Sequence, residues 1–169
     1  MSRKFLGKLG AAALAAAVVL PSGDAASSDR RVSCQSGIVG THLLTIRDQG
    51  GFIISRSVVA FHDDGTFIAI GSTQGQGVEG AAFSEEIGSY ECTGRRTAKG
   101  LLLDFGFLDP PDIGRTDWEI RMDSLTKSIR GTFVLYIILD APEADPLAEG
   151  LNPVGSFTFE GVRVPARDR

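Results

Sequence analysis

Metal ligands and thiols are scarce in this chain, which has two cysteines, two histidines and one tryptophan among 169 residues. Zinc sites use three or four protein ligands, and His42 and His62 alone are too few to form one. His62 stands beside two aspartates in a predicted turn, where a solvated hairpin tip is a simpler interpretation than a metal ligand or base. A Gly-x-Ser-x-Gly nucleophile elbow and a phosphate-binding loop are both missing from the sequence. The sequence therefore predicts no metal, no cofactor and no catalytic residue, although a triad set by geometry alone stays open.

Positive charge is also in short supply. Lysine and arginine total 17 against 21 aspartates and glutamates, for a formal charge of −4. Without the first 25 residues the formal charge becomes −6. Nucleic acid binding needs clustered lysines and arginines that neutralise phosphates, so no nucleic-acid partner is predicted. An anionic membrane surface is disfavoured for the same reason.

The N-terminus has the pattern of a secretory signal peptide. Basic residues precede an apolar run over 9–20, and a breaker with small residues follows and ends at Ala25. An uncleaved membrane anchor is the alternative, but twelve apolar residues are short of the roughly 20 that span a bilayer. We expect cleavage after Ala25 or one residue later, a secreted or periplasmic product and no membrane attachment afterwards. The expected organisation is a signal peptide at 1–25, a flexible lead-in at 26–38, one domain at 39–165 and a tail at 166–169.

Cys34 and Cys92 are the only cysteines. An exported compartment is oxidising, which favours a disulfide between them. Such a bond would close a loop of about 59 residues and stabilise the fold by about 4 kcal/mol in the chain-entropy model. Two free thiols, or a reactive nucleophile, is the alternative.

Extended segments with period-two patterning follow one another along the whole exported chain. Short turns rich in glycine, aspartate and proline separate them, and no helical period occurs after the signal peptide. An all-β chain of this kind predicts an eight-stranded antiparallel up-and-down barrel, with a two-sheet sandwich as the rival architecture. The predicted strands are residues 40–46, 52–61, 66–70, 87–93, 97–108, 115–123, 129–139 and 155–164.

Three strands carry patterns that predict which side faces the interior. Apolar and polar residues alternate along residues 115–123, with Trp118 on the apolar face and Glu119 on the solvent-facing one. In residues 97–108 the leucines and phenylalanines at odd positions form one face, so Asp104 is expected to point to water or to pair with an arginine. Residues 129–139 are apolar on both faces, which predicts that a loop, the N-terminal segment or another subunit covers the outside. A homo-oligomer, or such a covering segment, is expected on this basis.

The order of landmarks resembles a known group of proteins. Gly40-Thr41 opens the first strand, Phe61-His62-Asp63-Asp64-Gly65-Thr66 forms the second hairpin, and Gly88-Ser89-Tyr90 with Thr93-Gly94 frames the fourth strand. This sequence is similar to the small secreted β-barrels of the calycin and allene oxide cyclase kind. The resemblance implies a barrel with an interior cavity, and no cyclase catalytic residue can be transferred through it.

Three functions are compatible with such a barrel. A small, largely apolar ligand in the interior is favoured, with the glycine-rich segment 71–80 as a lid. An isomerase or cyclase assisted by Glu119 or Asp104 is the enzymatic alternative, and a filled barrel serving structure or interaction is the third. The candidate ligand-binding residues are Arg56, Tyr90, Phe105, Trp118, Phe133 and Tyr136.

Overall fold

The computed structural model describes residue 34 and residues 36–73, 83–106, 112–123, 125–139 and 143–166. The predicted signal peptide and most of the lead-in lie outside this part of the chain, as does most of the predicted lid segment. None of the described helical segments is long and apolar enough to cross a membrane. The strands are β1 (Gly40–Arg47), β2 (Ile53–Phe61), β3 (Thr66–Gly71), β4 (Glu86–Gly94), β5 (Thr97–Phe105), β6 (Ile113–Met122), β7 (Ile129–Ile138) and β8 (Gly155–Arg163).

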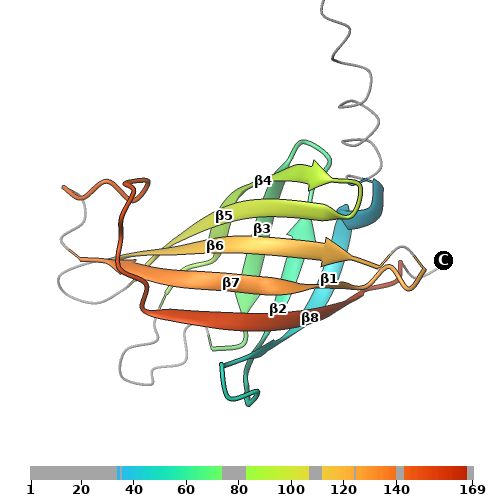
Figure 1. Ribbon diagram of the computed structural model, residues 1–169, viewed down its shortest axis with the longest axis horizontal. Coiled ribbons are helices and arrows are strands. Elements are labelled where there is room, and N and C mark those ends of the chain that lie inside the picture. Colours follow the sequence, from blue (N-terminus) through green and yellow to red (C-terminus); the bar gives the residue numbers. More distant parts are fainter. Residues whose placement is uncertain are drawn as a thin grey trace, which may run out of the picture.

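The eight strands form one closed antiparallel barrel in the order β1 to β8 (Figure 1). Each strand pairs with its neighbour in the chain, and β1 pairs with β8 from His42–Arg163 to Arg47–Thr158. Closure leaves no strand edge unpaired, which removes the template for edge-to-edge aggregation. The predicted up-and-down barrel is confirmed, and the two-sheet sandwich is excluded.

Alternation along β6 places side chains as its sequence pattern predicts. Trp118 and Ile120 are buried, whereas Glu119 and Arg121 are exposed on the outside. Glu119 Oε1 lies 3.1 Å from Lys99 Nζ of the neighbouring strand, in a solvent-exposed ion pair. The pleat of β6 therefore separates an apolar interior from a charged exterior.

The prediction for β5 is wrong in its choice of face. Leu102 is fully buried and Asp104 is only 9% exposed, whereas Phe105 is 62% exposed on the outside. The Phe67 ring accounts for this orientation of β5. It lies inside the barrel so close to Gly100 that a Cβ at this position would come within 2.8 Å of the ring, so the inward face of β5 is the one that carries Gly100. Both faces of β5 are apolar in sequence, so hydrophobicity alone could not tell them apart.

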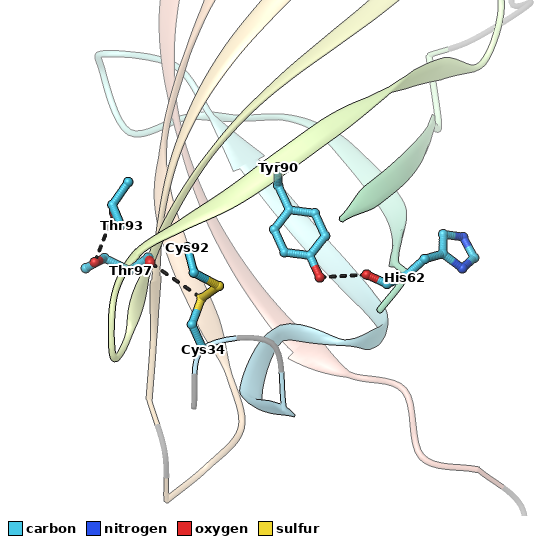
Figure 2. Close-up of a disulfide and its surroundings, with 6 residues drawn as sticks. All are labelled: Cys34, His62, Tyr90, Cys92, Thr93 and Thr97. Carbon is cyan, nitrogen blue, oxygen red and sulfur yellow. Dashed lines mark hydrogen bonds between the residues drawn. A yellow bond between two sulfur atoms is a disulfide. The ribbon is translucent and has the colours of Figure 1, made fainter. Parts of the chain in front are cut away.

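A helical turn before β1 closes the end of the barrel at which β1 begins and β4 ends. Cys34 and Ile38 are fully buried, and the Ile38 carbonyl oxygen lies 3.0 Å from Nε2 of buried His42. Cys34 is disulfide-bonded to Cys92 of β4, with Cα atoms 5.9 Å apart (Figure 2). The predicted disulfide is confirmed. The described end of the predicted lead-in thus belongs to the core.

Aromatic rings fill the half of the interior nearest this closed end. The Phe61 and Phe67 rings stack with centroids 5.1 Å apart, and the Tyr90 ring meets both edge-on. The Tyr90 hydroxyl donates a 2.6 Å hydrogen bond to the carbonyl of His62 in the β2–β3 turn (Figure 2). His62 itself is exposed, so the interpretation as a solvated hairpin tip is confirmed. Trp118 continues the cluster toward the middle of the barrel, with its ring 6.0 Å from that of Phe67.

The loop that precedes β8 is linked through Arg115 of β6 to one residue on the outside of β7. Arg115 Nη1 donates to the carbonyls of Pro146 and Ala148 in that loop, at 3.2 Å each. The same guanidinium lies over the Tyr136 ring of β7, 5.4 Å from its centroid. A loop was one of the predicted covers for this face. A homo-oligomer stays a prediction, and the exposed apolar side chains available to it include Leu139 (64% exposed) just after β7 as well as Ile70 (48% exposed) and Ile87 (58% exposed) on other strands.

Removing the disulfide tests how strongly the closed end stabilises the barrel. The double variant Cys34→Ala/Cys92→Ala is expected to lose about 2–4 kcal/mol of unfolding free energy, because the unfolded chain regains the freedom of a long loop. Urea denaturation followed by circular dichroism measures the loss. Reductant should lower the stability of the wild-type protein and leave the variant unchanged. Alkylation of two thiols in the folded, unreduced protein would contradict the bond.

Candidate functional site

The barrel is hollow at the end opposite the disulfide. A cavity of about 260 Å³ lies where β1, β3, β5 and β7 end and β2, β4, β6 and β8 begin. Most of its wall is apolar, and Phe133 and Phe157 separate it from the aromatic cluster, with ring centroids 5.1 Å apart. Its other apolar lining residues are Ile46, Ile54, Phe83, Leu135 and Ile137.

A hydrogen-bonded chain connects the aromatic core to a carboxyl group in this cavity. Trp118 Nε1 donates to Thr116 Oγ1 at 2.8 Å, and the Thr116 hydroxyl donates to Glu86 Oε2 at 3.1 Å. Trp118 and Thr116 are buried inward-facing residues of β6, and Glu86 is the first residue of β4. Burial, reinforced by the charge of Asp104, raises the pKa of the Glu86 carboxyl to about 7. The bond from Thr116 opposes this shift and holds the carboxyl in place.

Asp104 supplies a second carboxyl to the same wall, which corrects the expectation that it points to water. Its side chain lies against Gly114 of β6, where a Cβ would come within 2.5 Å of the carboxyl oxygen. Only glycine lets the two strands hold a carboxyl in this position. Burial raises the pKa of Asp104 to about 6, and a hydrogen bond from the Gly114 backbone opposes that shift.

A third carboxyl, that of Asp112, stands just before β6. Its backbone carbonyl accepts a 3.0 Å hydrogen bond from the Gly106 amide, and its side chain lies over that glycine. The Oδ1 atom of Asp112 is buried and has no hydrogen-bond partner among the described residues. Its negative charge contributes to the raised pKa of Asp104. A buried acceptor without a donor is costly, so this wall favours a molecule that donates hydrogen bonds.

No lysine or arginine of the described chain lines the cavity. The undescribed segments 74–82 and 107–111 also contain none in their sequence. Ser57 adds a hydroxyl to the wall, but it already donates to the Ile70 carbonyl at 3.1 Å. The cavity therefore combines an apolar surface with carboxyl groups that have no lysine or arginine beside them in the described lining. Within the described residues, no group of three or more histidines, cysteines, aspartates or glutamates is arranged to hold a metal ion.

Of the aromatic residues predicted to contact a ligand, only Phe133 lines the cavity. Tyr90 is buried within the aromatic cluster at the closed end. Trp118 is buried between that cluster and Phe133, with its ring stacked on Phe133 at 4.8 Å. Both residues fill the interior, and Trp118 contacts the cavity wall through its hydrogen bond to Thr116 and its stacking on Phe133.

Three other candidate ligand contacts lie on the outside of the barrel and do not line the cavity. Arg56 is exposed on β2, between inward-facing Ser55 and Ser57. Phe105 is exposed on β5 because its neighbour Asp104 takes the inward position. Tyr136 packs under Arg115 on the outer face of β7. Glu119, named for the enzymatic alternative, is likewise external.

The residues that sequence reasoning missed are Glu86, Asp112 and Thr116. A signal existed for Thr116, which precedes Trp118 by two residues and so shares its inward face. Glu86 and Asp112 stand at strand starts beside loops, where charged residues are common and usually solvated. Only barrel closure shows that these strand starts meet around one cavity. Comparison with protein-family models, curated proteins and solved structures finds no match to the chain.

The raised pKa of Glu86 predicts a pH-dependent stability. A carboxyl protonated more easily in the folded chain stabilises the fold at low pH, and this contribution is lost as pH rises from about 4.5 to about 7. The loss amounts to as much as about 3 kcal/mol. Glu86→Gln should flatten the dependence of unfolding free energy on pH, measured by urea denaturation at several values between pH 5 and 8. The exposed Glu119→Gln serves as control and should keep the wild-type slope. Equal slopes for Glu86→Gln and wild type would refute the assignment.

Proposed function

We propose that the chain is an exported protein that binds a small, largely apolar molecule in the cavity at the open end of the barrel. The observation that carries this proposal is the uneven filling of the interior. Aromatic rings occupy the end near the disulfide, whereas about 260 Å³ is left empty at the other end. Protein interiors are otherwise packed without voids larger than a water molecule, so a cavity of this size needs an explanation.

The size and chemistry of the cavity fit a small ligand. Its volume lies just under the roughly 300–1,000 Å³ typical of ligand pockets. Apolar side chains such as Ile46, Leu135 and Phe157 make most of the wall, with a few polar groups on one side. That combination gives affinity through apolar burial and orientation through the polar groups. A completely filled barrel with only a structural role accounts less well for the empty volume.

The compartment and family relationship belong to the same proposal. A disulfide is typical of proteins in oxidising compartments, which supports secretion or a periplasmic location. The closed eight-stranded antiparallel barrel is the architecture expected of a calycin-like protein. A closer relationship to allene oxide cyclases is an inference from the turn residues of the sequence.

Filling the cavity should abolish binding. Leu135 points into the cavity and its neighbour Val134 points outward, so Leu135→Trp and Val134→Trp place the same side chain on opposite faces of β7. We expect 1-octanol to bind the wild-type protein and Val134→Trp, and Leu135→Trp to lose at least about tenfold in affinity because the indole occupies the site. Isothermal titration calorimetry measures this. Similar affinities for the two tryptophan variants would place binding elsewhere, and no binding to wild type would overturn the proposal.

An isomerase or cyclase is the second candidate function. The observation in its favour is the Glu86–Asp104 pair, because carboxyls whose pKa values lie near 7 and 6 exchange protons readily at neutral pH. An apolar cavity would also shield a reactive molecule from water.

Catalysis would be visible in molecules that copurify with the protein. An isomerase lacking its acid–base group retains substrate, so Glu86→Gln and wild type should carry compounds of equal mass but different chromatographic retention. Native mass spectrometry followed by chromatography of the released compounds measures this, with Glu119→Gln as control. Identical compounds from all three proteins would count against catalysis at Glu86.

A further inference from the structure

The wall of the cavity carries negative groups without positive ones. Glu86, Asp104 and Asp112 all line it, and the described lining includes no lysine, arginine or histidine. Asp104 is 9% exposed, so little water remains to solvate its charge. Burying a carboxylate without a counter-charge is costly, and the cost falls when a cation enters with it. From this imbalance we propose that the ligand carries a protonated amine, which binds to the Glu86–Asp104 wall while its apolar part lies against the opposite side.

The unused hydrogen-bond acceptors of the cavity carboxyls also favour a ligand with a protonated amine. Glu86 Oε2 accepts one bond from Thr116, and Asp104 accepts from the Gly114 backbone, which leaves lone pairs free on both carboxyls. Asp112 Oδ1 is a buried acceptor with no partner in the described chain. An ammonium group has three donors and no acceptor, so it matches the free lone pairs of these carboxyls, while the Ser57 and Thr116 hydroxyls of the wall already donate within the protein.

The positions of the carboxyls are fixed before any ligand arrives. Glu86 is held through Thr116 to the indole of Trp118, itself stacked within the aromatic core. Asp104 rests against Gly114, where there is no side chain to displace it. A preorganised acidic wall avoids the cost of ordering flexible side chains on binding.

An anionic amphiphile such as a fatty acid is disfavoured by the same geometry. Its carboxylate would enter a poorly solvated cavity that already contains three acidic side chains. Like charges close together in such a site repel strongly, and at least one would have to become protonated. The site therefore distinguishes among amphiphiles of equal length by the charge of the head group.

Three probes with the same eight-carbon chain test this inference, which rests on the proposed function. n-Octylamine, 1-octanol and octanoate are titrated into the protein by calorimetry at pH 7.5. Octylamine is expected to bind about 10–100-fold more tightly than octanol, the range for hydrogen bonds to charged groups. Octanoate is expected to bind more weakly than octanol. Octylamine affinity should also rise between pH 5 and 8 as the Glu86 and Asp104 carboxyls ionise.

Variants locate the preference at the acidic wall. Glu86→Gln and Asp104→Asn should each reduce the ratio of octylamine to octanol affinity by about tenfold or more and weaken its pH dependence. Glu119→Gln removes an external carboxylate and should keep the wild-type ratio. Circular dichroism and thermal melting identify any variant that fails to fold, and the wild-type probe comparison stands without the variants.

The outcomes separate the two proposals. Octanol binding with no preference for octylamine would overturn the amine inference and leave the cavity as a binding site for neutral molecules. Tighter binding of octanoate than octanol would overturn it as well. If none of the three probes binds, both the inference and the proposed function fail.

Discussion

Pairing between the first and last strands is the constraint on which the rest of the structure depends. Hydrogen bonds from β1 to β8 turn an open meander into a closed barrel, and closure creates an interior with only two ends. The disulfide between Cys34 and Cys92 then holds a helical turn across one of them. The other end has no such cover among the described residues, and the cavity lies there.

Two kinds of interaction divide the interior along the barrel axis. Near the disulfide, stacked and edge-on aromatic rings bury large areas and leave no room for a ligand. At the open end, carboxyl groups and shorter apolar side chains surround empty space. The Trp118–Thr116–Glu86 hydrogen bonds join these two regions, so the rigid packing of one end orients a titratable group in the other.

The sequence was sufficient to predict the strands, their number and the closed topology, because alternation and turn chemistry are local signals. Strand β5 shows where local signals end. Leucines occupy both of its faces. Which face points inward depends on Phe67 of β3, whose ring fills the space next to Gly100. Asp104 therefore faced inward against expectation. Phe105 was predicted to share the inward face of Leu101 and Leu103, and the same inversion of β5 places it outside.

The acidic wall illustrates a second limit. Glu86 begins β4 and Asp112 precedes β6, and neither has a sequence neighbour that marks it as buried. Their proximity arises from barrel register, in which the starts of even-numbered strands meet the ends of odd-numbered ones. Pairwise register over eight strands cannot be worked out to single-residue precision from one sequence.

The distance between the disulfide-bound turn and the cavity has a consequence for how this chain can change over time. Side chains such as Ile54, Leu135 and Ile137 contribute to the cavity wall, while the aromatic cluster that dominates the buried core lies elsewhere. Their replacement would change the shape of the cavity without altering the stacked rings of that cluster. Gly114 is the exception, since any larger residue there would collide with Asp104. Substitutions at the cavity rim are therefore expected to cost less folding free energy than substitutions among the stacked rings near the disulfide.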